Sequence, residues 1–157
     1  MFRKKRSINN KNIDKALNLI EKYQQSKCAG GLLITGETGT GKIFLMQQYL
    51  ETQESKEKIL VATTPIQSTV RAFNEELLGK LFDPFPNRGT LVVKTRRLIE
   101  RIKTLDIELI MVDDFQGVWS GSRQDTIEVL EFLVHLMKKR MFRLSSWGQM
   151  NPSVLLS

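Results

Sequence analysis

A glycine-rich segment with phosphate-binding chemistry, GETGTGK, occupies residues 36–42 directly after the apolar run LLIT. Its three glycines allow a tight turn whose backbone N–H groups point inward and can hold phosphate oxygens at the start of a helix. Lys42 is placed to reach the β- and γ-phosphates of a nucleotide. The predicted nucleotide contacts are Gly36, Glu37, Thr38, Gly39, Thr40, Gly41, Lys42 and Ile43. A plain glycine turn with a solvated lysine is the alternative, but the position between a predicted buried strand and a predicted helix favours a nucleotide site.

Two adjacent carboxylates, Asp113 and Asp114, end the apolar run LIMV about seventy residues further on. A site of this kind needs a carboxylate at the end of a neighbouring strand to hold magnesium, so we predict a metal-linked role for Asp113. Asp114 takes the position in which a glutamate commonly polarises the attacking water, and we predict that Asp114 and Lys42 are the catalytic residues. Aspartate is one methylene shorter than glutamate, and a displacement of about 1 Å can lower a rate about 100-fold. Solvated carboxylates at a strand end are the alternative.

Ile43 conflicts with the rest of the glycine-rich segment. A serine or threonine at this position would offer its oxygen to magnesium, whereas isoleucine offers only a branched apolar group. The backbone amides and Lys42 can still hold phosphates. We therefore predict nucleotide binding with weakened magnesium affinity and slow hydrolysis. A working nucleotide motor and a decayed copy are the alternatives.

Buried strands and amphipathic helices must position these residues, and they alternate along the chain. Helices are predicted at residues 12–25, 43–53, 68–83, 90–105 and 124–140, and buried strands at 30–36, 58–65 and 108–115. A fourth strand, RLSSWG at 143–148, is a weaker prediction because its middle is polar. In the last long helix the residues expected to face inward are Ile127, Leu130, Phe132, Leu133 and Leu136.

This alternation predicts an α/β fold, a three-layer P-loop NTPase with a parallel sheet and helices on both faces. We expect the strands at 30–36 and 108–115 to be adjacent at the centre of the sheet. Residues 1–10 are assigned to a basic tail and residues 11–157 to one domain. With 157 residues, 41% hydrophobic and 26% charged, the composition is ordinary for a soluble globular domain.

The composition also limits the partners and the compartment. No apolar run approaches the roughly 18 residues that cross a bilayer, and no apolar stretch typical of a signal peptide follows MFRKKRS. We therefore expect a cytoplasmic protein without membrane contact. One cysteine and one histidine, Cys28 and His135, leave no zinc-binding set. His135 is expected to be a packing or surface residue. Packing is the expected role of Trp119 and Trp147, and stacking on bases is the alternative.

The net charge of +7 favours anionic partners such as DNA, although a solvated basic surface gives the same number. Basic residues gather at the N-terminus and again in the helix predicted at 90–105. The second group consists of Lys94, Arg96, Arg97, Arg101 and Lys103. We expect non-specific DNA contact through such surfaces.

The order of these motifs resembles the TniB and TnsC-like transposition ATPases, which are AAA+ proteins encoded beside a transposase in bacterial mobile elements. The resemblance is carried over residues 10–140 by GLLITGETGTGK, TTP, DPFPNRG, KTRRLIERIK, ELIMVDDFQ and VWSGSRQ. It implies ATP and Mg²⁺ as cofactors, contacts from residues 36–42, a magnesium-linked role for Asp113 and a catalytic position for Asp114. It also implies DNA, the transposase of the same element and further copies of the chain as partners.

Two departures from the family pattern, Ile43 for threonine and Asp114 for glutamate, imply weak hydrolysis. The family continues with a sensor strand, an arginine finger and a helical lid, and we expect a truncated or degenerate ATPase, in which SSWGQ is a degenerate sensor strand or the last residues are out of frame. The leading hypothesis is an ATP-binding protein of transposition that selects a target or activates the transposase. The alternatives are a non-catalytic, nucleotide-dependent partner-binding module and a helicase-loader or origin-type AAA+ protein.

Overall fold

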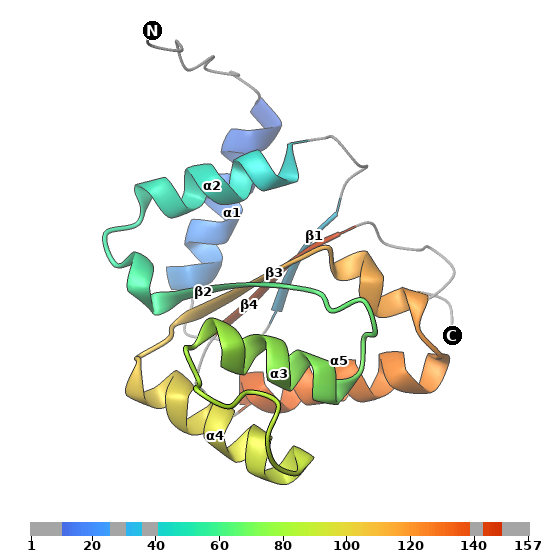
Figure 1. Cartoon of the computed structure of the whole chain (residues 1–157). Helices are drawn as coiled ribbons and strands as arrows, with labels where there is room; N and C mark the ends of the chain where they lie inside the picture. The colour runs from blue at the N-terminus through green and yellow to red at the C-terminus, as the bar shows by residue number, and fades with distance from the viewer. Residues whose placement is uncertain (1–10, 26–30, 36–40, 139–142, 149–157) are drawn as a thin grey trace, which may run out of the picture.

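The computed structural model describes residues 11–25, 31–35, 41–138 and 143–148 of the chain (Figure 1). Helices and strands alternate as the sequence predicts. The helices are α1 (Lys11–Gln25), α2 (Lys42–Thr52), α3 (Val70–Lys80), α4 (Leu91–Thr104) and α5 (Arg123–Lys138), with short 3-10 helices η1 (Lys56–Lys58) and η2 (Phe115–Ser120). The strands are β1 (Gly31–Thr35), β2 (Ile59–Thr63), β3 (Leu109–Asp113) and β4 (Arg143–Gly148).

The four strands form one parallel sheet in the order β1-β4-β3-β2. The fourth strand is therefore confirmed, but the expected adjacency of β1 and β3 is wrong, because β4 lies between them. Leu33 of β1 is opposite Ser146 of β4, and Met111 of β3 is opposite Ser145. Backbone hydrogen bonds on both edges hold a central strand whatever its side chains are. The polar residues in RLSSWG therefore made a central strand of the sheet, β4, hard to predict from the sequence.

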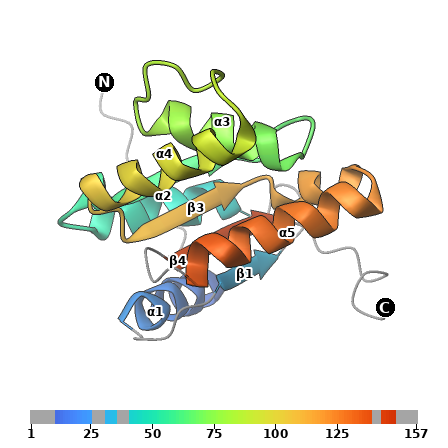
Figure 2. The same cartoon turned by 90° about the horizontal axis from the view of Figure 1, so that it is seen from below.

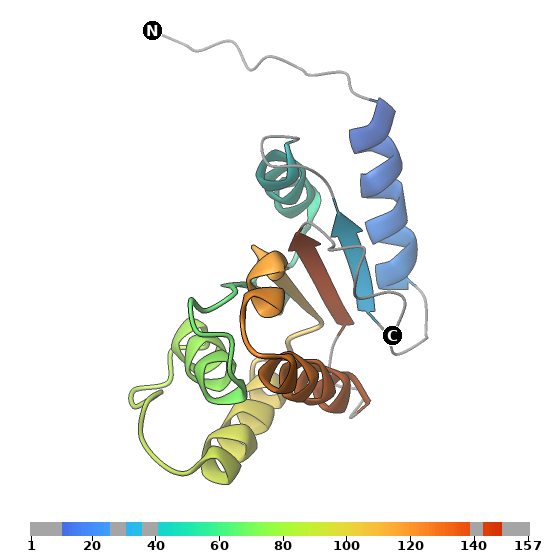
Figure 3. The same ribbon diagram turned by 90° about the vertical axis from the view of Figure 1, so that its right-hand side faces the viewer.

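Helices cover both faces of the sheet, which confirms the three-layer α/β architecture (Figures 2 and 3). In β3, Leu109 and Met111 pack in a cluster with α1 and α2, whereas Ile110 and Val112 pack in a larger cluster with α3, α4 and α5. Successive side chains of a strand point to opposite faces, so a strand buried on both faces reads as a continuous apolar run. This is why LIMV predicted a central strand correctly.

Threonine side chains begin the two helices that follow β2. The hydroxyl of Thr69 accepts a hydrogen bond from the Ala72 amide at 3.2 Å, and that of Thr90 accepts one from the Val93 amide at 3.4 Å. The helix predicted to start at Ser68 begins two residues later, at Val70, with Thr69 as its cap, because the Ser68 hydroxyl instead donates to the Gly117 carbonyl at 2.9 Å. Threonine satisfies the free amides of a first helical turn as serine does, so the sequence alone did not separate the two.

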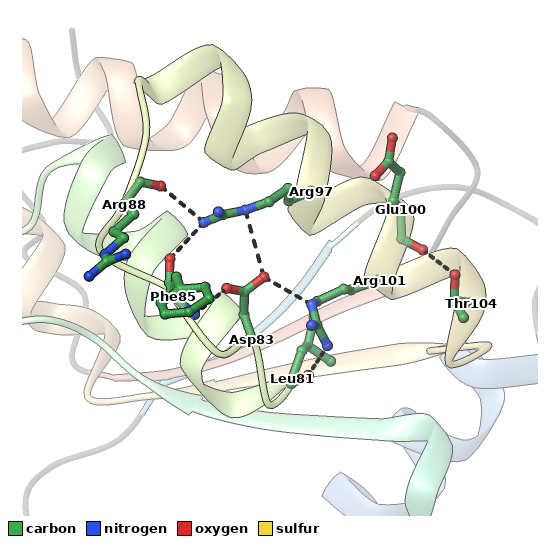
Figure 4. A network of polar contacts seen from close by, with 8 residues as sticks. All are labelled: Leu81, Asp83, Phe85, Arg88, Arg97, Glu100, Arg101 and Thr104. Carbon is green, nitrogen blue, oxygen red and sulfur yellow. Dashed lines mark hydrogen bonds and ion pairs between the residues drawn. The ribbon is translucent and has the colours of Figure 1, made fainter.

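Three cations of the predicted basic group are engaged inside the protein. The ammonium of Lys94 is fully buried and forms an ion pair with Glu75 of α3, whose side chain is 28% exposed. Arg97 and Arg101 both contact Asp83 (Figure 4). Arg96 and Lys103 remain exposed. The sequence pattern therefore overstates the free positive charge of α4.

Asp83 organises the loop between α3 and α4. Its carboxylate, 4% exposed, accepts hydrogen bonds from the Phe85 amide at 2.8 Å and from Arg101 Nε at 3.0 Å, and Arg97 Nε lies 3.6 Å away. The same two guanidinium groups also donate to loop carbonyls. These carbonyls belong to Leu81, Phe85 and Arg88. The chain from residue 81 to residue 88 is thus fastened to α4 at several points.

We expect the stability of the protein to fall at low pH partly through Asp83. Burial of this carboxyl raises its pKa, but the Phe85 amide and then Arg101 and Arg97 outweigh burial, so the pKa lies below the ordinary value of 3.8. The ionised carboxylate therefore stabilises the fold above about pH 4, and this contribution is lost as the pH falls through the lower pKa of the folded state. Asp83→Asn should lower the free energy of unfolding at pH 7 and flatten its loss between about pH 5 and pH 2.

Urea denaturation at a series of pH values checks this expectation. Glu57→Gln, a change at an exposed carboxylate of η1, serves as the matched control and should follow the wild-type curve. If the free energy of unfolding of Asp83→Asn falls with pH as steeply as that of the wild type, protonation of Asp83 does not contribute to the loss of stability.

Candidate nucleotide site

The glycine-rich segment connects the end of β1 at Thr35 to the start of α2 at Lys42. Gly41 has φ 88° and ψ 19°, a left-handed conformation that glycine adopts without penalty. No atom lies within 4 Å of the position that a Cβ at Gly41 would take, so the requirement for glycine here is conformational and not steric. The predicted contacts Gly36, Glu37, Thr38, Gly39 and Thr40 lie outside the described residues.

The first turn of α2 suits an anion. The first four amides of an α-helix have no partner within the helix, and the helix dipole places partial positive charge there. No side chain caps this N-terminus, and the first turn contains no acidic residue. Lys42 opens the helix with a partly buried side chain. Backbone amides and one cation therefore converge at the end of α2 that follows the glycines.

Ile43 is 57% exposed in this first turn. An exposed isoleucine contributes little to the core, so packing does not explain its presence. It supplies no oxygen where the ion of a bound nucleotide would need one. The weakened magnesium affinity inferred from Ile43 therefore stays a prediction, and we expect Ile43 to affect ion binding and not folding.

Asp113 and Asp114 mark the end of β3 and the turn into η2. Asp113 Oδ1 accepts a hydrogen bond from the Asp114 amide at 2.8 Å. Asp114 is exposed and has φ 57° and ψ 37°, a left-handed conformation that is uncommon for a residue with a side chain. The Gln116 side-chain amide donates to Asp114 Oδ1. The chain therefore leaves the extended conformation of β3 at Asp114, and Gln116 holds the Asp114 carboxylate.

Two residues at this edge escaped the sequence analysis. Gln116 belongs to the segment DDFQ, and nothing in that pattern predicts its contact with Asp114. Thr64 follows β2, and its amide donates to the Asp113 carbonyl at 3.0 Å. Its hydroxyl is buried and has no hydrogen-bond partner among the described residues. In the sequence, Thr64 is only a polar residue before Pro65 at the end of a predicted strand, and this pattern also fits an ordinary turn.

The sheet brings the end of β1 and the carboxylates at the end of β3 to the same side. All strands are parallel, so β1 and β3 end on the same side, separated by β4 and hence by about 10 Å at the usual spacing of strands. The helix after β1 covers one face of the sheet and the helix after β3 covers the other (Figure 3). Ligands of open α/β sheets bind in the crevice at such a point, outside the carboxyl ends of the strands.

The donor set fits a magnesium ion that is held mainly by phosphates. Within the described residues no three metal-ligating side chains gather. Mg²⁺ in nucleotide sites is commonly bound by one or two carboxylates together with phosphate oxygens and water. Asp113 is therefore sufficient as a protein contribution, while the hydroxyl that Ile43 lacks would normally be a second one. In the part of the chain that the structure describes, no helix is long and apolar enough to span a membrane.

Comparison with known proteins identifies both a family and a fold. Residues 2–150 match the family model described as "Bacterial TniB protein". The Cdc6p protein of Pyrobaculum aerophilum superimposes with a TM-score of 0.65 at 19% identity, covering 99% of this chain and 42% of that one. The ORC2 protein of Aeropyrum pernix, solved as ADPNP-ADP complexes, gives 0.61 at 15% identity, covering 86% and 40%. No curated protein matches the sequence significantly.

These likenesses confirm the predicted P-loop NTPase fold of the AAA+ type, and at such identities they carry the fold alone. The chain spans about 40% of the length of the two solved structures.

Proposed function

Because the chain belongs to the bacterial TniB family, we propose that it is an ATP-binding protein of DNA transposition that hydrolyses ATP slowly. It binds the nucleotide between β1 and α2, and it selects a target or activates the transposase of the same element. The observation that carries the proposal is that β1, which precedes Gly41 and α2, lies across β4 from β3 and its terminal Asp113, within a chain of this family.

The residues divide the work according to their chemistry. The amides at the start of α2 and the ammonium of Lys42 hold the phosphates by charge-assisted hydrogen bonds. Asp113 would hold the magnesium shell, and the ion would polarise the γ-phosphate when ATP is bound. Asp114 would hold a water molecule and accept its proton, and Gln116 fixes the carboxylate that does so.

DNA contact is proposed to be non-specific and weaker than the sequence suggests. Lys94, Arg97 and Arg101 are engaged with Glu75 and Asp83, so α4 offers only Arg96 and Lys103 to phosphates. Each phosphate contact adds to the slope of affinity against salt concentration. We therefore expect a shallow salt dependence for any binding through α4.

Replacing Ile43 by threonine is expected to raise ATP turnover by about tenfold or more, since it restores an oxygen ligand for the ion that polarises the phosphate. Ile43 is 57% exposed, so the change should leave the free energy of unfolding within about 0.5 kcal/mol of the wild type. Phosphate release with and without DNA, at saturating ATP, measures the effect.

Ile43→Val is the matched control, because it alters the same side chain without adding an oxygen. Equal turnover in both variants and the wild type, with ATP still bound, would show that Ile43 is not what limits hydrolysis. Absence of turnover in all three proteins, with ATP still bound, would instead favour a non-catalytic module whose bound nucleotide stabilises a docking surface.

A further inference from the structure

The chain between β2 and α3, residues 64–69, packs against the turn that follows Asp114. Ser68 is 3% exposed. Its hydroxyl lies 2.9 Å from the Gly117 carbonyl oxygen and 3.1 Å from the Pro65 carbonyl oxygen. Because a hydroxyl carries one proton, the two carbonyls share it. Ser68 thus bridges the chain after β2 and the 3-10 helix η2.

Gly117 of η2 lies so close to residues 64–69 that even a methyl group does not fit without movement. A Cβ placed on Gly117 would lie 3.0 Å from Thr64 Cγ2 and 4.0 Å from Ser68 Oγ. Carbon atoms in van der Waals contact are about 3.5 to 4.0 Å apart. Glycine is therefore required at residue 117 by the available space, whereas Gly41 is required by its backbone conformation.

Thr64 joins this contact to the end of β3. It is 7% exposed, and its amide donates to the Asp113 carbonyl at 3.0 Å. Its hydroxyl has no hydrogen-bond partner among the described residues, and a buried hydroxyl without a partner is unfavourable. The backbone bond to Asp113 and the packing of the methyl group on Gly117 therefore place Thr64, and its hydroxyl does not.

The two carboxylates of the candidate site depend on the position of η2. The Gly117 amide donates to the Asp114 carbonyl at 2.9 Å. The Asp114 amide in turn donates to Asp113 Oδ1 at 2.8 Å. Asp114 has φ 57°, and such a conformation persists at a residue with a side chain only where its surroundings hold it. A displacement of Gly117 is therefore passed on to both carboxylates.

The core holds the other side of η2. Val118 is fully buried and Phe115 is 5% exposed, and both belong to the larger apolar cluster. The Val118 carbonyl accepts a hydrogen bond from the Thr126 hydroxyl of α5 at 2.8 Å. With this side fixed, the contact of Gly117 with Thr64 and Ser68 determines how the rest of η2 lies.

We propose that Ser68 and Thr64 are positioning residues for ATP hydrolysis. They fix Gly117, and Gly117 holds the turn that carries Asp113 and Asp114. The inference rests on the proposed function, because it presupposes that these two carboxylates serve the bound nucleotide. In the sheet, β2 is three strands away from β1, which is about 14 Å at the usual spacing. Ser68 and Thr64 therefore act through the carboxylates and not on the phosphates held at α2.

Gly117→Ala tests the proposal with a single added methyl group. The methyl must move η2 away from Thr64 by a few tenths of an ångström. We expect ATP turnover to fall about tenfold, since a displacement of about 1 Å can lower a rate about 100-fold. Ser68→Ala should act in the same direction. It should still fold, because the Ser120 hydroxyl also donates to the Gly117 carbonyl, at 2.7 Å.

Removing the opposing methyl group should reverse the effect. In Gly117→Ala combined with Thr64→Ser, the added Cβ no longer meets Cγ2 of residue 64, and the next atom, the Cβ of residue 64, lies 3.6 Å away. The double variant should recover most of the wild-type turnover. Gly79→Ala is the matched control, because a Cβ at this exposed glycine of α3 has no atom within 4 Å. Thr104→Ala, which removes an exposed hydroxyl bonded to the Glu100 carbonyl, is the control for Ser68→Ala.

The effect of Mg²⁺ on ATP affinity is a readout that a purely structural role would not change. Because Asp113 is expected to hold the magnesium shell, Mg²⁺ should raise the affinity of the wild type for ATP. This increase should shrink in Gly117→Ala and return in the double variant, whereas the affinity measured in EDTA should be equal in all proteins. Isothermal titration gives the affinities, and release of radiolabelled phosphate over several hours gives the turnover. Both are measured at a temperature at which circular dichroism shows every variant to be folded.

The outcomes separate this inference from the proposed function. If the wild type binds and hydrolyses ATP, and Gly117→Ala and Ser68→Ala match it in turnover and in the Mg²⁺ effect, the inference alone is overturned. A loss of turnover that Thr64→Ser does not reverse would also overturn it, because the displacement would not come from the Thr64 contact. If the wild type binds ATP without hydrolysing it, the Mg²⁺ effect decides in the same directions. Absence of ATP binding by the wild type would overturn the proposed function and this inference together.

Discussion

Replacing Lys42 by alanine is expected to lower the affinity for ATP by about 100-fold, equivalent to about 3 kcal/mol. Lys42 begins α2 directly after the left-handed Gly41, where the helix amides and its ammonium act on the same anion. Hydrogen bonds to charged groups contribute about 1.5 to 3 kcal/mol each, and this lysine is expected to reach two phosphates. Isothermal titration with ATP measures the change.

Lys56→Ala removes an exposed lysine of the neighbouring η1 and serves as the control for loss of general positive charge. Its affinity for ATP should equal that of the wild type. If Lys42→Ala binds ATP as tightly as the control does, the start of α2 does not hold the phosphates and the assignment of the site fails.

Replacing Glu75 by alanine is expected to destabilise the fold by about 3 to 5 kcal/mol, the usual cost of leaving a buried charge without its partner. The ammonium of Lys94 is fully buried and its ion pair is with Glu75. Removing the carboxylate leaves the buried ammonium between α3 and α4 without its ion-pair partner. Urea denaturation of the purified variant at pH 7 gives the free energy of unfolding.

Lys94→Met should cost far less, about 1 kcal/mol or below, although it breaks the same ion pair. Methionine occupies a similar volume without a charge, and the Glu75 carboxylate is 28% exposed and can be hydrated. The order of the two variants is the informative result. If Lys94→Met were the less stable of the two variants, the attraction within the ion pair would contribute more to stability than the cost of burying the Lys94 charge takes away.

The fold class followed from the sequence because buried parallel strands and amphipathic helices have distinct periods. LIMV is buried on both faces, and its alternate residues join the two clusters. The order of the strands could not be predicted, because the position of β4 depends on its backbone pairing with β1 and β3, which the residues of RLSSWG do not reveal. The family resemblance was confirmed over residues 2–150.

The candidate site was predictable where local rules act. Gly41 takes the left-handed conformation that the glycine segment requires, and α2 begins at Lys42. Contacts that depend on tertiary structure were not predictable. The link between Gln116 and Asp114, the buried Thr64 hydroxyl and the capture of Arg97 and Arg101 by Asp83 all arise from loops whose course the sequence pattern does not fix.

The measurement that bears most directly on the central claim is a titration of the wild-type chain with Mg²⁺ and ATP, followed by counting the phosphate released per bound nucleotide. We predict saturable binding of one ATP per chain with a Kd below about 100 µM and phosphate release slower than about one per minute. Absence of saturable binding up to about 1 mM ATP would contradict the account, because the residues around Gly41 and Lys42 would then not form a nucleotide site.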